Sequence, residues 1–194
     1  NALRWHVKRA GSRDEYLSVL QAYYFARFIE GTVKSDAGCE IRNGIKAIKK
    51  FGVAKATVWP YVVENFDDRP PDEAVRLGSL WTTLTYERVD IGVRSVKRAL
   101  AEYFPVAIGV SLYSSFESDE VAKTGVVPFP DVDKEDLVGG HAMLCVGYEK
   151  GHFIVLNSWG TDWGDGGYCY LPEKYVGSTK FGGDYWVIKN LGGT

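Results

Sequence analysis

The sequence has 194 residues, of which 45% are hydrophobic and 25% are charged. This composition is that of a folded domain and argues against disorder. The formal net charge of −2 gives no reason to expect nucleic acid or an anionic membrane as a partner. The longest apolar runs, such as residues 104–113, are too short to span a bilayer, so no membrane insertion is expected.

The first half of the chain is expected to be helical. Apolar residues recur at helical spacing from Ala2 to Ala10, and Gly11 is a plausible stop. Asn1 is already in register with this pattern, and no turn precedes it. A natural helix needs partners for its first amides, so we expect that the chain is truncated at its N-terminus.

Two further helices have recognisable ends. Ser18 begins the sequence Ser-Val-Leu-Gln, which fits a capping box, and the helix that follows should end at Gly31. Another helix is expected over about Ile41–Phe51, with Gly52 as its C-terminal stop.

The next part of the chain mixes loop, helix and strand. Pro60 and Pro70 break the regular pattern, and Pro71-Asp72-Glu73 fits the start of a short helix. A strand is expected near residues 82–89 and a helix near residues 93–103.

The second half is expected to form a sheet. Short apolar runs separated by glycine-rich or charged turns indicate five strands, at 105–113, 141–148, 152–157, 167–172 and 184–189. The sequence therefore predicts the α+β class, with a helical lobe over residues 1–103 and a β-rich lobe over residues 104–194.

Residues 141–157 are predicted to form a hairpin that places a histidine near an asparagine. With a turn near residue 150, His141 lies within about two residues of the position opposite Asn157. Both numbers are odd, so without a bulge the two side chains share one face. An amide oxygen that accepts a hydrogen bond from one ring nitrogen fixes the tautomer of a histidine and aims the other nitrogen at a proton donor.

The alternative is that His141 is structural, as most single histidines at strand ends are. The segment that follows, "NSWGTDWGDGGY", favours the chemical interpretation. Its glycines and aspartates suit a tight, specific loop and suit neither helix nor strand. Trp159, two residues after Asn157, is placed to exclude water from a His–Asn hydrogen bond and so strengthen it.

The stretch "GGHAMLCVGY", followed by "FIVLNSWGTDWGDGGYCYLP", resembles the histidine and asparagine signatures of the papain-like cysteine peptidases. The segment "YYFARFIEGTVKSDAGCEIRNGIKAIKKFGVAKATVWPY" is similar to a microbial and viral branch of that family, and the resemblance covers about residues 19–189. It implies a two-lobed fold, with a β-barrel-like C-terminal lobe and an active-site cleft between the lobes.

The resemblance also implies roles for particular residues. His141 would be the general base and acid, Asn157 its orienting partner, and Trp159 the indole that shields them. Gly139, Gly140 and Ala142 would border the pocket for the substrate side chain next to the scissile residue. Small residues leave such a pocket open, so a bulky apolar or aromatic side chain is expected there.

Two departures from the family pattern are visible. In this branch the residues after the nucleophilic cysteine look like Asn1-Ala2-Leu3, so the nucleophile is expected about two residues before Asn1, preceded by the oxyanion-hole glutamine. The glycine-rich segment that pairs with substrate backbone is replaced by Glu40-Ile41-Arg42.

The cysteines in the chain are poor substitutes for that nucleophile. Cys145 and Cys169 lie in apolar strands and are expected to be buried and inert. Cys39 precedes a helix N-terminus, where a thiolate would be stabilised, but the family keeps this position away from the catalytic histidine. His6 and His152 have no ligand-type neighbours, so neither a metal nor another cofactor is expected.

The leading hypothesis is a cysteine endopeptidase that acts on peptides or proteins through a thiolate–imidazolium pair. The alternative is an inactive papain-like protein with a binding or structural role; an acyl-transferring relative such as a transglutaminase would want aspartate at Asn157. Few cysteines and no signal segment favour an intracellular or virion-enclosed setting. The sequence does not indicate an oligomeric state.

Overall fold

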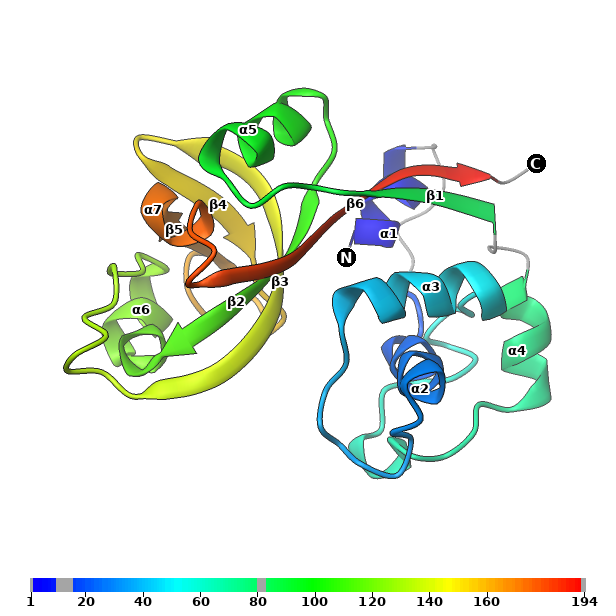
Figure 1. Ribbon diagram of the computed structural model, residues 1–194. Helices are drawn as coiled ribbons and strands as arrows, with labels where there is room; N and C mark the ends of the chain where they lie inside the picture. Colours follow the sequence, from blue (N-terminus) through cyan, green and yellow to red (C-terminus); the bar gives the residue numbers. More distant parts are fainter. Residues whose placement is uncertain (1, 10–15, 80–82, 193–194) are drawn as a thin grey trace. The chain divides into compact units, whose positions relative to one another are not determined.

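The computed structural model describes residues 2–9, 16–79 and 83–192, so the predicted roles of Asn1 and Gly11 lie outside the described residues. The backbone divides into two compact units (Figure 1). The first unit is Asn1–Tyr86 with Ile188–Thr194, and the second is Glu87–Val187. The division into lobes at residue 104, which the sequence suggested on other grounds, stays a prediction.

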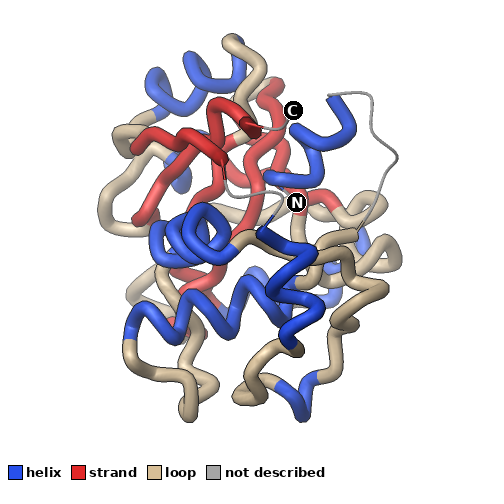
Figure 2. The backbone as a smooth tube through the Cα atoms, turned by 90° about the vertical axis from the view of Figure 1, so that its right-hand side faces the viewer, coloured by secondary structure: helices blue, strands red, loops and turns tan. Residues whose placement is uncertain are grey.

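The first unit is built mainly from helices. They are α1 (Ala2–Arg9), α2 (Val19–Glu30), α3 (Ile41–Phe51) and α4 (Asp72–Gly78), with a 3-10 turn, η1 (Val63–Asn65). The predicted helices from Ser18, over 41–51 and from Pro71 are confirmed. Long loops connect these helices (Figure 2).

Helix α2 begins and ends where its sequence predicts. The Ser18 hydroxyl oxygen accepts a hydrogen bond from the backbone N–H of Gln21 (3.1 Å), and Gly31 ends the helix with a left-handed φ of 74°. The reciprocal half of the predicted capping box is wrong. The buried Gln21 side chain instead accepts from the N–H of Ala54 (2.9 Å) and donates to the carbonyl of Ala74.

Helices α2 and α3 pack together through aromatic and small side chains. The rings of Phe25 and Phe51 stack with centroids 4.3 Å apart, while Ala26 and Ala47 are fully buried. Gly52 ends α3 with a φ of 70°, and a Cβ built there would lie 1.8 Å from the carbonyl oxygen of Gly78. Only glycine fits this position without a shift of the backbone.

The strands alternate with shorter helices in the remainder of the chain. The elements are β1 (Thr83–Arg88), α5 (Val93–Ala101), β2 (Val106–Tyr113), η3 (Ser114–Glu117), α6 (Asp119–Thr124), β3 (Leu137–Glu149), β4 (His152–Leu156), β5 (Tyr168–Pro172), α7 (Glu173–Val176) and β6 (Gly182–Gly192). Every predicted strand is present. Helices α6 and α7 were not predicted, because four to six residues are too few to show a helical apolar pattern.

The strands form one six-stranded sheet in the order β1-β6-β2-β3-β4-β5, and the division between the units passes through β1 and β6. The α+β class is confirmed, but the expected barrel-like closure is wrong. A barrel requires its first and last strands to pair, whereas β1 and β5 lie at opposite ends of the hydrogen-bonding order. The sheet is therefore open.

The core of the second unit lies on one face of this sheet. Along β2, every second residue is at most 4% exposed: Val106, Ile108, Val110 and Leu112. Phe153, Val155 and Leu171 from β4 and β5 join them, with Val96 from α5 and Val176 from α7. Buried apolar area of this kind supplies the main stabilisation of the unit and fixes the faces of β3 and β4.

Candidate active site

The β3–β4 hairpin carries the two residues that the sequence singled out. Its turn consists of Lys150 and Gly151, both with positive φ (45° and 83°), between the paired residues Glu149 and His152. Such primed turns match the twist of the flanking strands. The pairing then shifts by one residue between Cys145 and Gly147, which is a β-bulge.

This bulge corrects an assumption made from the sequence. The shared face of His141 and Asn157 was predicted for a hairpin without a bulge, and that premise is wrong. The two-residue turn alone would pair odd-numbered residues with even-numbered ones and would separate the two side chains. The extra residue, Val146, restores the pairing in which Leu144 opposes Leu156, so the next residue Asn157 and the more distant His141 share a face.

The predicted contact between these residues is confirmed. The distance from Nε2 of His141 to Oδ1 of Asn157 is 2.8 Å. Asn157 is 4% exposed, so water has little access to this bond. A hydrogen bond in such surroundings is stronger than one in bulk water.

A second bond assigns the direction of the Asn157 amide. The backbone N–H of Ser158 donates to the same Oδ1 (2.8 Å), which identifies that atom as an acceptor. Because an amide oxygen only accepts, Nε2 of His141 must carry the proton of this bond. In the neutral ring, Nδ1 is then the basic nitrogen, as the proposed chemistry requires.

Aromatic rings surround the histidine. The indole of Trp159 lies 5.3 Å from the imidazole between centroids, with an interplanar angle of 39°. Phe116, at 1% exposure, lies 5.5 Å from Trp159 in an edge-to-face arrangement and stacks on Trp163 at the same distance. We name Phe116, Trp159 and Trp163 the aromatic cluster. The sequence indicated Trp159 but missed Phe116, an aromatic residue in the short segment that follows the strand ending at Tyr113.

The loop after Asn157 holds the cluster through backbone contacts. The N–H of Asn157 donates to the carbonyl of Gly167 (3.0 Å), and the N–H of Gly164 donates to that of Ala122 (2.6 Å). Gly164 has a φ of 62°, and a Cβ there would lie 2.4 Å from the carbonyl oxygen of Tyr168. The glycines of this loop are thus required by its tight course, as the sequence predicted.

The residues expected to border a substrate pocket lie on β3 beside the histidine. Gly139 and Gly140 precede His141, and Ala142 follows it. A Cβ built at Gly139 or Gly140 would have no heavy atom within 4 Å. Side chains of moderate size therefore fit at Gly140, while Gly139, with a φ of 153°, also favours glycine for its backbone.

The cysteines lie where the sequence predicted. Cys145 and Cys169 are fully buried, and burial raises the pKa of each thiol to about 12. Neither thiol forms the thiolate that a nucleophile requires at neutral pH. Cys39 is exposed and lies just before α3 in the first unit.

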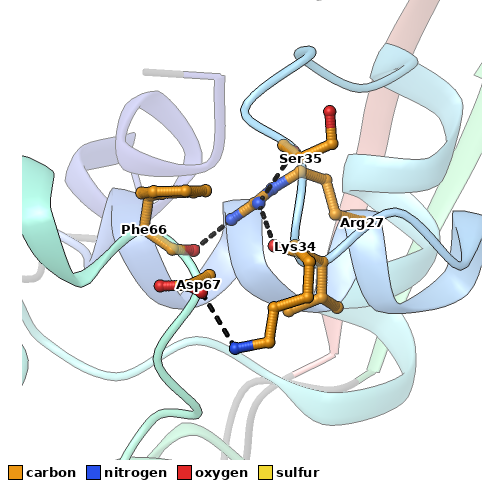
Figure 3. A network of polar contacts seen from close by, with 6 residues as sticks. Arg27, Lys34, Ser35, Phe66 and Asp67 are labelled. Atoms are coloured by element: carbon orange, nitrogen blue, oxygen red, sulfur yellow. Dashed lines mark hydrogen bonds and ion pairs between the residues drawn. The ribbon is translucent and has the colours of Figure 1, made fainter.

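In the first unit, a buried arginine holds the loop between α2 and α3. Arg27 of α2 is fully buried, and its guanidinium donates to the carbonyls of Val33 (2.6 Å), Ser35 (3.1 Å) and Phe66 (Figure 3). The ring of Tyr23 lies 3.9 Å below the guanidinium. These bonds fix the loop that leads from α2 to α3. Sequence reasoning missed this role.

The same loop is closed by a carboxylate at the end of α2. Oε1 of Glu30 accepts from the backbone N–H of Glu40 (3.0 Å) and from Nδ2 of Asn43 (2.8 Å). Glu40 therefore has a fixed backbone at the start of α3, directly before Ile41.

Among the described residues, histidines, cysteines and carboxylates form no group of three or more that could hold a metal ion. The helices in that part of the chain are too short or too polar to cross a membrane.

Comparison with known proteins identifies relatives over most of the chain. The papain family cysteine protease profile matches residues 30–182. An uncharacterized peptidase C1-like protein of Acanthamoeba polyphaga mimivirus is 36% identical over 184 residues, which are 90% of this chain and 59% of that protein. Cathepsin L of Sarcophaga peregrina is 38% identical over 141 residues, 68% of this chain and 39% of that protein. The chain thus spans three fifths or less of the length of these relatives.

The solved structures agree with this assignment. Xylellain, a cysteine protease from Xylella fastidiosa, superposes with a TM-score of 0.91 at 32% identity, covering 98% of this chain and 76% of that one. The fold is therefore that of the papain-like cysteine proteases. The chain belongs to the papain family, and its relatives support a cysteine peptidase function.

Proposed function

We propose that the protein is a cysteine endopeptidase in which His141 is the general base and acid and Asn157 orients it. The observation that carries the proposal is the 2.8 Å bond between these side chains, whose acceptor is assigned by Ser158. The bond fixes the tautomer with the proton on Nε2, which leaves Nδ1 for proton exchange with a thiol. Trp159 would shield this bond from water.

The proposed reaction proceeds in two steps, acylation of the thiol and hydrolysis of the acyl-enzyme. The nucleophilic cysteine, which we place about two residues before Asn1, would lose its proton to Nδ1 of His141 and attack the carbonyl carbon of a peptide bond. The imidazolium would then donate that proton to the leaving amine, and water would hydrolyse the acyl-enzyme with His141 as the base. The orienting bond to Asn157 persists through both steps because it involves only Nε2.

A thiol-directed epoxide or vinyl sulfone tests this assignment in the full-length protein. We expect covalent labelling of one cysteine upstream of Asn1, mapped by peptide mass spectrometry, together with loss of peptidase activity. The variant His141→Ala should abolish the rapid labelling, since the thiol then lacks its base. Absence of rapid labelling in the wild type would favour the alternative, an inactive papain-like protein with a binding or structural role.

We further propose that Gly139, Gly140 and Ala142 border a pocket for a bulky apolar or aromatic substrate side chain next to the scissile residue. The open space around a Cβ at Gly140 supports this proposal. The variant Gly140→Val should keep the fold but lower kcat/KM for bulky substrates by about tenfold or more, with a smaller effect on alanine-containing ones. Equal effects on both substrates would contradict the pocket assignment.

The proposed setting is intracellular or virion-enclosed. It is supported by a relative in a virus, whose 36% identity extends over nine tenths of this chain. Detection of the protein in purified particles or in infected-cell extracts would test it, and its recovery only from culture medium would oppose it.

A further inference from the structure

A short turn of the second unit connects His141 and the aromatic cluster to the acidic segment 131–136. This turn is η3, which follows β2 and carries Phe116. Phe116 is 1% exposed and contacts the other two members of the aromatic cluster, and its ring centroid lies 6.5 Å from that of His141. Any displacement of η3 therefore changes the packing around the imidazole.

The turn η3 has few regular hydrogen bonds of its own, because 3-10 turns are short and end with unsatisfied amides. Two of its backbone N–H groups are held from outside, by the segment 131–136. The N–H of Ser114 donates to the carbonyl of Asp136 (3.0 Å), and that of Ser115 donates to a carboxylate oxygen of Glu135 (3.0 Å). Ser115 directly precedes Phe116.

The Glu135 carboxylate binds two amides at once. While Oε2 accepts from Ser115, Oε1 accepts from the backbone N–H of Asp131 (2.8 Å). Both of its oxygens are used, one on η3 and one on its own loop, so the side chain connects the two segments. A charged acceptor forms bonds about twice as strong as those of a neutral one.

We propose that Glu135 is a positioning residue of the active site, which holds η3 so that Phe116 keeps Trp159 and His141 in their working arrangement. The inference deepens the proposed function and rests on it. Glu135 acts through Phe116 and has no part in the chemical step. The side chain is only partly buried, so substitution there does not open the core.

The electrostatics of the loop agree with this role. The hydrogen bond from the Ser115 side chain, followed by the backbone bonds, holds the pKa of the Glu135 carboxyl below its usual value, against the effects of burial and of Asp131. Asp131 is itself paired with Lys134 (2.8 Å), and Tyr175 also interacts electrostatically with the Glu135 carboxyl. A lowered pKa means that the bond is complete above about pH 4.5 and is lost as the pH falls through the pKa of the folded state.

The test compares Glu135→Gln with Asp133→Asn. The first variant keeps the size of the side chain but replaces one acceptor oxygen by a donor. The second removes the same charge from the same loop and leaves both Glu135 bonds in place. In the active full-length protein we expect Glu135→Gln to lower kcat about three- to tenfold with KM unchanged within about twofold, and Asp133→Asn to leave both unchanged.

A second readout is independent of activity. In the 194-residue chain, the NMR shifts of the His141 ring protons report the neighbouring aromatic rings. We expect these shifts to move toward unstacked values in Glu135→Gln, and in the wild type as Glu135 is protonated, but not in Asp133→Asn. Equal His141 shifts in both variants would overturn the proposal, even if the protein proved not to be a peptidase. If the wild-type protein shows the expected His141 shifts but is not labelled by a thiol probe, the result would instead count against the proposed function.

Discussion

Replacement of Asn157 by alanine is the most direct test of how the site is built. The change removes the acceptor of two bonds of 2.8 Å, one from Nε2 of His141 and one from the backbone N–H of Ser158. Because Asn157 is 4% exposed, water does not readily replace either partner. The imidazole can then rotate and adopt the other neutral tautomer.

The size of the effect follows from the bonds that are lost. A hydrogen bond to a charged partner, as the imidazolium is during catalysis, contributes about 1.5–3 kcal/mol. If all of this is lost in the transition state, kcat/KM of Asn157→Ala falls about 10- to 100-fold. Loss of the bond from the N–H of Ser158 adds about 0.5–1.5 kcal/mol of destabilisation, which urea unfolding measures.

The control is Asn157→Asp, which keeps an acceptor oxygen for both donors. It should retain more activity than Asn157→Ala and should keep His141 protonated on Nε2, as read from ¹⁵N shifts of the ring. The reasoning would be refuted by an Asn157→Ala variant with wild-type kcat/KM, or by a wild-type ring protonated on Nδ1 alone.

Two further predictions concern buried groups away from the pair. In the native 194-residue chain, iodoacetamide at about pH 6–9 should label Cys39 and spare Cys145 and Cys169, because a pKa of about 12 keeps these two buried thiols neutral. Labelling of all three cysteines should require denaturant. Labelling of Cys145 or Cys169 in the native chain would contradict their burial. Arg27→Met should lower the free energy of unfolding by about 3–5 kcal/mol, because it removes three hydrogen bonds from a charged donor to partly buried carbonyls. The exposed Arg69, which forms an ion pair with Asp72 (3.1 Å), is the matched control, and Arg69→Met should change that free energy by less than about 1 kcal/mol.

Much of the local structure was available from the sequence. Ser18 and Gly31 fix the ends of α2, and Gly52 ends α3, because each end needs a side-chain acceptor or a left-handed residue that few residue types supply. The turn at Lys150–Gly151 and the signature around His141 likewise indicated the hairpin and its pair. These features depend on residues close together in the chain.

Other features depended on contacts between distant segments. The side-chain amide of Gln21 does not cap α2 as predicted. It forms hydrogen bonds with the backbone of Ala54 and Ala74, because a buried side chain bonds to the polar groups that surround it in the fold. Phe116 packs against Trp159 on η3, a turn whose backbone is bonded to Glu135 about twenty residues further along the chain. Patterns of neighbouring residues do not predict such contacts between segments that are far apart in the sequence.

Spacing and turn chemistry are local properties, so the amino-acid sequence was enough to predict that a histidine and an asparagine meet on a hairpin. The face that each side chain occupies depends on the folded sheet. The Lys150–Gly151 turn sets the register in which Glu149 pairs with His152. Burial of the apolar side chains of β3 and β4 favours the register in which Leu144 pairs with Leu156, and the bulge at Val146 allows both. The packing of the core against the sheet, which involves the whole unit, is the physical reason that the second register prevails.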